Sequence, residues 1–342
     1  MPKTFYIMDS FLLPTGYNHM FMVQKIGRGF GYHGFKTKVV SKISEIDGPG
    51  VVMLCDHPVY YSFGSRRNRN GNVLRLIPGA IERIDRKVKI FSRISVYLQC
   101  RAYEKLAEQI EGKNVFLIVW NTTDKRKEFL DKLGIPIIFT SEYYGARPKT
   151  PCQIVWYRLY TNKKNRNCMP LRFGADVDPK AVGKGCTNNR YTIAYVGDKS
   201  YIRRYADLFE KRNDVRIVAT PPYISEAEKV AIYKNSMIIL GLTSDQSKRD
   251  NHVPERIFES LAFGAICLTD SMPAVKQTKC CATYFRNKMD LKEMIEKFRA
   301  DKKLRGSLRK KNFAYIKREG TWASRAEDFI NLANKLYKIN LK

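Results

Sequence analysis

Short apolar runs alternate with helical patterns along nearly the whole chain, and this alternation is what most constrains the fold. The runs predict strands at residues 4–8, 36–40, 51–55, 115–120, 135–140, 191–196, 215–219, 237–242 and 266–269. The patterns between and after them predict helices from about residue 19, within 89–110, over 125–133, 201–211 and 226–235, through the segment before 266, and near 289–300, 303–317 and 322–339. Strands separated by helices favour parallel pairing, so the fold class is α/β.

The middle of the chain differs in composition from both sides. Residues 161–170 are polar and basic, and residues 174–190 are rich in Gly, Asp, Asn and Lys. Such a change marks a linker between domains. We therefore expect a first Rossmann-like domain at 1–173, a linker at 174–190, a second at 191–320, and a final helix at 321–342 that crosses back to the first domain. The cleft between two such α/β domains is a usual place for a ligand.

The chain is strongly basic. It contains 62 Lys and Arg against 33 Asp and Glu, a formal net charge of +29. An excess of this size should attract a polyanion. Nucleic acid is the first candidate, and anionic lipid or an acidic polysaccharide the second. A basic bias without any partner is the alternative.

Cysteine usage and hydropathy bear on the compartment. The eight cysteines are scattered, with Cys280 and Cys281 adjacent and no CxxC pair. This favours reduced thiols in an intracellular protein. The N-terminus has no signal-peptide pattern, and no apolar run approaches the ~18 residues of a membrane span. The expectation is a monomer without a transmembrane segment in the cytoplasm, which is the host cytoplasm if the protein is viral.

The segment 251–270 predicts an amphipathic helix followed by a short apolar strand. Arg256 and Glu259 stand three apart, so they share one face of that helix. A guanidinium can bind a phosphate through its planar fork, and a carboxylate can accept both hydroxyls of a ribose. The pair therefore suits a nucleotide-sugar donor. The alternative is a surface ion pair worth a few tenths of a kcal/mol.

A second candidate begins at Gly197, in a predicted loop between a strand and a helix. Helix N-termini bind phosphate, and Lys199, Arg203 and Arg204 add positive charge there. Cations are unfavourable at this end of a helix, and a bound anion would resolve the conflict. The alternative is a solvated basic pair.

For a general base, Glu142 is the best-placed carboxylate. It follows the predicted strand 135–140, and α/β folds bind ligands at the carboxyl ends of their strands. Asp9 and Asp56 also follow apolar strands and are rivals. The alternative for Glu142 is an exposed loop acid.

Other patterns carry less weight. Asp176-Val177-Asp178 could hold a divalent metal, but it lies in the linker rather than after an apolar strand, so no metal is indicated. Gly27 to Gly31 has alternate glycines outside a dinucleotide-binding position and is expected to form a turn. The four histidines are far apart and show no zinc spacing.

Basic residues follow aromatic ones repeatedly in the first half. Arg66, Arg67 and Arg69 follow Tyr60, Tyr61 and Phe63; Arg147 and Lys149 follow Tyr143 and Tyr144; Lys163, Lys164 and Arg166 follow Tyr157 and Tyr160. Basic side chains bind phosphates and aromatic rings stack on bases. Together these clusters favour a nucleic-acid surface on the first domain.

With these residues collected, the chain resembles GT-B glycosyltransferases over about 191–332, and more narrowly the bacteriophage DNA β-glucosyltransferase type. The resemblance runs through Asp250-Asn251, Arg256-Ile257-Phe258-Glu259, Ala262 and Cys267-Leu268-Thr269-Asp270, and extends to Tyr195-Val196-Gly197 and Arg204. The same pattern also resembles glycosyltransferases of surface glycans.

The resemblance implies roles for these residues. Arg256 and Glu259 would hold the diphosphate and ribose of a UDP-sugar, with UDP-glucose the expected donor, and Arg204 would grip the diphosphate. Where the phage type has a second Arg in the glycine loop, this chain has Ser200, so Lys199 or Arg203 would substitute. Glu142 takes the role of the base that follows an F-T strand end. Asn251 stands where many retaining enzymes carry a Glu, which favours inversion.

The expected activity is transfer of a sugar to hydroxymethylated bases in double-stranded DNA. A glycosyltransferase of a surface or capsid glycan is one alternative. A non-catalytic DNA-binding protein on a GT-B scaffold is the other.

Overall fold

The structure is a computed structural model that describes residues 4–8, 18–40, 43–55, 108, 115–120, 137–139, 168–170, 173–187, 189–210, 212–220, 224–249 and 253–337. It divides into two compact units. The first comprises Met1–Ser141, Arg147–Leu171 and Ile330–Lys342, and the second comprises Glu142–Ala146 and Arg172–Phe329. The domain limits expected from composition remain predictions.

The first unit is built on a parallel sheet of six strands. They are β1 (Thr4–Met8), β2 (Lys36–Val40), β3 (Gly50–Cys55), β4 (Val115–Trp120), β5 (Ile137–Phe139) and β6 (Cys168–Pro170), in the order β2-β1-β3-β4-β5-β6. Every described pairing is parallel. The short helix η1 (Ile43–Glu45) precedes β3. The first five strands confirm the apolar runs, whereas β6 lies in the basic segment 161–170 and was not predicted.

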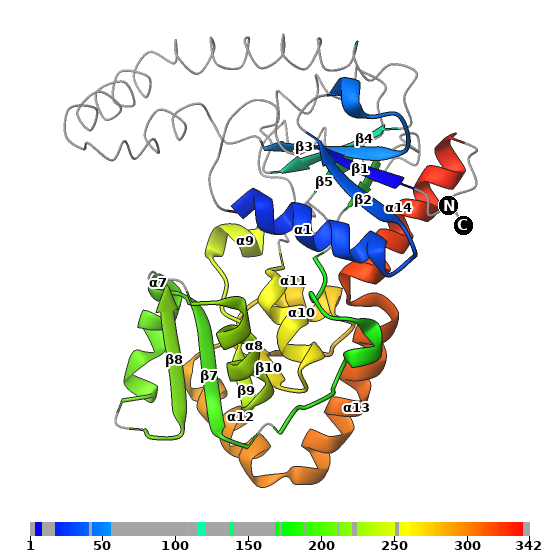
Figure 1. Ribbon diagram of the computed structural model, residues 1–342. Helices are drawn as coiled ribbons and strands as arrows, with labels where there is room; N and C mark the ends of the chain where they lie inside the picture. Colours follow the sequence, from blue (N-terminus) through cyan, green and yellow to red (C-terminus); the bar gives the residue numbers. More distant parts are fainter. Residues whose placement is uncertain are drawn as a thin grey trace, which may run out of the picture. The chain divides into compact units, whose positions relative to one another are not determined.

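Helix α1 (Asn18–Gly31) covers this sheet beside β1 and β2 (Figure 1). Its Phe30 ring stacks on Phe5 of β1 with centroids 3.7 Å apart. The turn expected at Gly27 to Gly31 is wrong, because these residues form the last turns of α1. A Cβ on Gly27 would lie 3.3 Å from Thr37 Oγ1, so the glycine lets the helix pack close to β2. The helices expected at 89–110 and 125–133 lie outside the described residues, apart from Glu108.

The second unit contains a five-stranded parallel sheet. Its strands are β7 (Tyr191–Asp198), β8 (Val215–Thr220), β9 (Ser236–Leu240), β10 (Ile266–Thr269) and β11 (Thr283–Tyr284), in the order β11-β10-β9-β7-β8. Four of these strands follow the predicted runs, and β7 is longer than expected. Gly197 therefore lies inside β7 rather than in a loop.

Helices accompany this sheet along the chain (Figure 1). They are η2 (Pro179–Ala181), α7 (Lys199–Ile202), η3 (Arg203–Leu208), α8 (Glu226–Lys234), α9 (Asp245–Arg249), α10 (Glu255–Ala262), α11 (Met272–Gln277), α12 (Lys288–Ala300) and α13 (Lys302–Glu319). The last helix, α14 (Trp322–Tyr337), begins in the second unit, and its residues from Ile330 onward belong to the first. The single helix expected at 201–211 is two short pieces, α7 and η3, which begin two residues earlier. The last three helices lie close to their predicted positions.

Buried apolar residues cover both faces of the second sheet. On β7, Ile193 and Tyr195 join a core cluster with Phe298 of α12, whereas Ala194 and Val196 join another with Tyr233 of α8. Alternate residues of a strand point to opposite faces, so the sheet lies between two helical layers. This is the doubly wound α/β arrangement that the sequence predicted.

Candidate functional site

The strand order of the second sheet fixes where a ligand edge lies. β7 has β8 on one side and β9 on the other, so the connections that leave β7 and β9 run to opposite sides of the sheet. In open α/β sheets ligands bind outside the carboxyl ends of the strands at this switch point. The residues there are Gly197 and Asp198 at the end of β7, the segment from Gly241 to Ser244 after β9, and the start of α10.

Arg256 lies in the first turn of α10 and reaches across the end of β7. Its guanidinium occupies the space over Gly197 where a Cβ would otherwise be, close to the hydroxyl of Tyr195. Its Nη1 atom is buried and has no hydrogen-bond partner among the described residues. Burial raises the pKa of Tyr195 to about 12, and the charge of Arg256 opposes that shift. A buried guanidinium nitrogen without a protein acceptor is suited to binding an anion.

The N-terminus of α10 supports the same interpretation. Pro254 occupies the N-cap position and makes no side-chain capping hydrogen bond. Free N–H groups at the start of a helix attract phosphate, and the helix dipole adds to this attraction. The helix of eight residues therefore presents its positive end and the Arg256 side chain at the same ligand edge.

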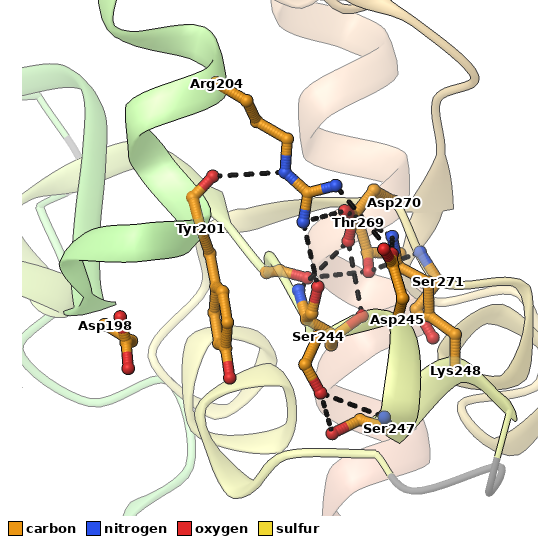
Figure 2. A network of polar contacts seen from close by, with 12 residues as sticks. Asp198, Tyr201, Arg204, Ser244, Asp245, Ser247, Lys248, Thr269, Asp270 and Ser271 are labelled. Atoms are coloured by element: carbon orange, nitrogen blue, oxygen red, sulfur yellow. Dashed lines mark hydrogen bonds and ion pairs between the residues drawn. The ribbon is translucent and has the colours of Figure 1, made fainter.

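Arg204 belongs to a network of polar contacts beside this edge (Figure 2). Its Nη2 atom donates to the Thr243 carbonyl at 3.1 Å and lies 3.4 Å from Asp270 Oδ2. Its Nη1 atom lies 3.9 Å from Asp245 Oδ1. The cation that seemed misplaced at a helix start is therefore compensated by two carboxylates of this chain, without any bound anion.

Lys248 shares both of these acidic partners. Its Nζ atom lies 2.8 Å from Asp270 Oδ2 and 3.2 Å from Asp245 Oδ1. The side chain of Asp270 is only 6% exposed, and its other oxygen accepts from the Thr243 amide at 3.0 Å. The network thus places two cations, Arg204 and Lys248, around one buried carboxylate (Figure 2). Sequence reasoning missed Lys248 and gave Asp270 no role.

Glu259 is buried rather than displayed on a surface. Its side chain is 3% exposed, and Oε1 lies 2.9 Å from Lys229 Nζ of α8. Lys229 also contacts Glu226 at 2.6 Å. Burial lowers the pKa of Lys229, but Glu259 and Glu226 raise it more, so the net shift is upward. Glu259 is therefore half of a buried ion pair with Lys229, and the surface-pair alternative is wrong.

The remaining expected residues near β7 take different positions. Lys199 and Arg203 are exposed, and no described contact of their side chains forms an ion pair. Ser200, which stands where the resemblance implies an Arg, donates to Asp198 from both its amide and its hydroxyl, at 2.7 and 2.6 Å. These hydrogen bonds lower the pKa of Asp198. Glu142, Asp9 and Asp56 lie outside the described residues.

Three further expectations concern metals and membranes. Asp178 caps η2 by accepting from the Lys180 amide at 2.7 Å. Within the described parts of the chain, no group of three or more His, Cys, Asp or Glu side chains is arranged to hold a metal ion. None of the described helices is long and apolar enough to cross a membrane.

Comparisons with known proteins bear on the fold and on the class of enzyme. Residues 188–331 match the family described as glycosyl transferase-like. No curated protein matches the chain. An α-glucosyltransferase solved with UDP and a 13-mer DNA containing an HMU base is 10% identical, with a TM-score of 0.59 over 98% of this chain and 100% of that chain.

Two more solved structures share the arrangement. An α,α-trehalose 6-phosphate synthase from Burkholderia multivorans is 10% identical, with a TM-score of 0.53 over 99% of this chain and 98% of that chain. A DNA-modifying β-glucosyltransferase is 10% identical, with a TM-score of 0.49 over 97% of this chain and 99% of that chain. The chain therefore has the GT-B fold, and its residues 188–331 resemble glycosyl transferases.

Proposed function

We propose that this chain transfers a sugar, with inversion, from a UDP-sugar to hydroxymethylated bases in double-stranded DNA. The observation that carries the donor part is the buried, unpartnered Nη1 atom of Arg256 at the switch point of the second sheet. The uncapped start of α10 lies at the same edge. A diphosphate there would accept from Arg256 and lie at the positive end of the helix.

Arg204 and Lys248 would provide further cationic hydrogen-bond donors for the same ligand. Each is held by Asp270, and each is partly exposed, at 39% and 24% of its side chain. A diphosphate leaving group gains negative charge as its bond to the sugar breaks. Fixed cations aimed at that charge stabilise the transition state more than the ground state.

The ribose would be recognised near Glu259. Its carboxylate is fixed by Lys229, so it is held in one orientation rather than free to rotate in solvent. A fixed carboxylate oxygen can accept a ribose hydroxyl with little loss of side-chain entropy. In this proposal the Lys229–Glu259 pair is a support for the donor site as well as part of the core.

The acceptor part rests on charge and on one structural relative. The net charge of +29 favours a polyanion, and the α-glucosyltransferase with the TM-score of 0.59 was solved with DNA containing a modified base. A base buried in a duplex is reached by flipping it out of the stack. Glu142 is proposed to take the proton from the acceptor hydroxyl, with Asp9 as the competing candidate.

The donor site is tested by titrating UDP into the wild type and into Arg256→Ala and Arg256→Lys by calorimetry. The Ala variant should lose at least tenfold in affinity, and the Lys variant should recover only part because it cannot form a bidentate contact. Unaltered UDP binding in Arg256→Ala would show that this edge is not the donor site.

The acceptor is tested with labelled UDP-sugars and four acceptors: hydroxymethylated duplex, unmodified duplex, an oligosaccharide and water. Transfer to the hydroxymethylated duplex alone supports the proposal. Transfer to the oligosaccharide with DNA ignored would establish a glycan-building enzyme. Tight DNA binding with neither transfer nor hydrolysis would establish a non-catalytic DNA-binding protein. Glu142→Gln and Asp9→Asn then identify the base, since only its loss should abolish transfer while UDP still binds.

A further inference from the structure

The long helix α13 carries a row of lysines on its exposed face. Lys303, Lys310 and Lys317 are all exposed and are spaced seven residues apart. Seven residues are nearly two helical turns, so the three side chains share one face with about 10.5 Å between neighbours along the axis. The opposite face is buried through Asn312, Tyr315 and Ile316.

Small residues separate these lysines. Gly306, Ser307 and Ala314 are exposed on the same side of the helix, and a Cβ on Gly306 would meet no atom within 4 Å. A ligand can therefore come close to the helix backbone in the gaps between the lysines. Such a surface suits a long, regularly charged ligand better than a compact one.

The charge of α13 is almost entirely positive. The helix contains eight Lys and Arg and a single acidic residue, Glu319. Glu319 is already paired with Lys279 at 2.5 Å and with Arg318 at 2.6 Å. The described contacts of Lys303, Lys310 and Lys317 include no ion pair.

Other basic residues of the helix differ from the lysine row because their side chains contact the rest of the second unit, as Lys311 does at the Cys280 carbonyl, 3.1 Å away. Arg305 donates to the carbonyls of Phe298 and Arg299 at the end of α12, and Arg309 donates to the Gly264 carbonyl at 2.9 Å. These side chains stabilise the second unit itself. Among the described contacts, the three lysines of the row make no hydrogen bond of this kind that would stabilise the fold.

The chemistry of the exposed face favours nucleic acid over a lipid surface. Helices that lie on membranes insert large apolar side chains beside their basic ones. The large exposed apolar residues among those described are Tyr32, Val39, Met272 and Met289, and none of them belongs to α13. Lysines without apolar anchors are typical of sequence-independent contacts to a phosphodiester backbone.

We propose that the row of Lys303, Lys310 and Lys317 on α13 binds the phosphate backbone of a DNA duplex. This surface lies in the second unit, outside the donor-site residues, and adds to the basic clusters of the first half. It deepens the DNA-acceptor part of the proposed function and rests on it for its biological meaning, but the binding itself does not depend on a donor.

The test compares two variants that each lose three charges. One is the triple change Lys303→Gln, Lys310→Gln and Lys317→Gln. The control is Lys36→Gln, Lys292→Gln and Lys297→Gln, which removes exposed lysines from β2 and α12. Gln has a good helix propensity at the five helical positions, and Lys36 is an exposed residue at the start of β2, so both variants should fold, as circular dichroism will check.

Binding of a labelled 30-base-pair duplex is followed by fluorescence anisotropy from about 50 to 200 mM salt. The α13 variant should lose at least tenfold in affinity at the lower salt, and its salt slope should shrink by about 2 to 3, since each phosphate contact contributes about 0.9. The control should change little. An α13 variant that matches the control in affinity and slope would overturn the proposal.

Two further measurements make the result specific. Vesicles containing phosphatidylserine should bind more weakly than the duplex, and a preference for vesicles that depends on the same three lysines would overturn the nucleic-acid assignment. UDP binding by calorimetry should be equal in both variants and the wild type. Failure of the α13 proposal leaves that UDP binding intact, whereas failure of the donor site appears in Arg256→Ala and not in either lysine variant.

Discussion

The guanidinium of Arg256 fills the space over Gly197 that a side chain at that position would claim. One residue comes from the end of β7 and the other from the first turn of α10, 59 positions later in the chain. Gly197 was expected to begin a loop that binds phosphate at a helix N-terminus. Instead it makes room for the side chain that would hold the phosphate.

Gly197→Ala should therefore weaken nucleotide binding without unfolding the protein. The added methyl overlaps the guanidinium and must displace Arg256, which costs about 1 to 3 kcal/mol of overpacking. We expect at least a tenfold loss in UDP affinity by calorimetry. Gly306→Ala on the open face of α13 is the matched control, and it should stabilise the fold by up to about 1 kcal/mol with UDP binding unchanged. Equal effects of the two changes would contradict the assignment.

Glu259→Gln should be among the most destabilising single changes in the second unit. It leaves the largely buried Lys229 ammonium without its nearest buried partner. Breaking a buried pair by removing one member costs about 3 kcal/mol or more, as denaturant unfolding would measure. Glu226→Gln removes the outer partner, whose side chain is 47% exposed, and should cost less than about 1 kcal/mol. A loss of equal size in both variants would show that Glu259 does not anchor Lys229.

Tyr195→Phe should reveal a stability change at alkaline pH. The tyrosine hydroxyl donates to the Asp198 carbonyl at 2.8 Å, so its loss should cost about 1 kcal/mol near neutral pH. Burial raises the pKa of Tyr195 to about 12. Between pH 10 and 12 the unfolded state releases this proton while the folded state keeps it, so the free energy of unfolding falls as the pH rises.

By pH 11 the free energy of unfolding of the wild type should fall by about 1.4 kcal/mol more than that of Tyr195→Phe. The advantage of the wild type over Tyr195→Phe should therefore disappear between pH 8 and pH 11 in urea titrations. A constant difference across this range would mean that the hydroxyl titrates normally in the folded state.

Asp270→Asn should strengthen binding of anions at the ligand edge. The buried carboxylate compensates both Arg204 and Lys248, and the amide keeps an oxygen to accept from the Thr243 N–H. We expect UDP affinity to rise severalfold at low salt, uridine affinity to stay the same, and stability to fall by about 1 to 3 kcal/mol. Asp245→Asn, whose side chain is 72% exposed, should have a smaller effect on both. Weaker UDP binding in Asp270→Asn would show that the carboxylate serves mainly to position the two cations.

Much of the fold could be predicted because apolar runs report buried strands directly. The strands β7 to β10 and the three final helices follow their runs and patterns closely. The strand β6 was not predicted because three residues in a basic segment give no periodicity to detect. The extended backbone at Gly197 and the helix at Gly27 to Gly31 were also not predicted, since glycine suggests a loop unless its packing partner is known.

The site could be predicted only in part, and for a related reason. Arg256 could be singled out as a candidate because it lies in a recognisable helix pattern. Lys229, Lys248 and Asp270 lie 8 to 30 positions from Arg256 and Glu259. The parallel order of β7, β9 and β10 brings them near these residues. Partnerships across a sheet leave no local signal, so the compensation of Arg204 by Asp270 had to come from the structure.

The two sheets share one strand order over their first five strands. β2-β1-β3-β4-β5 in the first unit corresponds to β8-β7-β9-β10-β11 in the second. The chain therefore has the layout of a tandem duplication, and each copy brings its own point where successive connections diverge. A reaction that joins two different molecules needs two binding edges, and repeating one fold supplies the second edge without inventing a new topology.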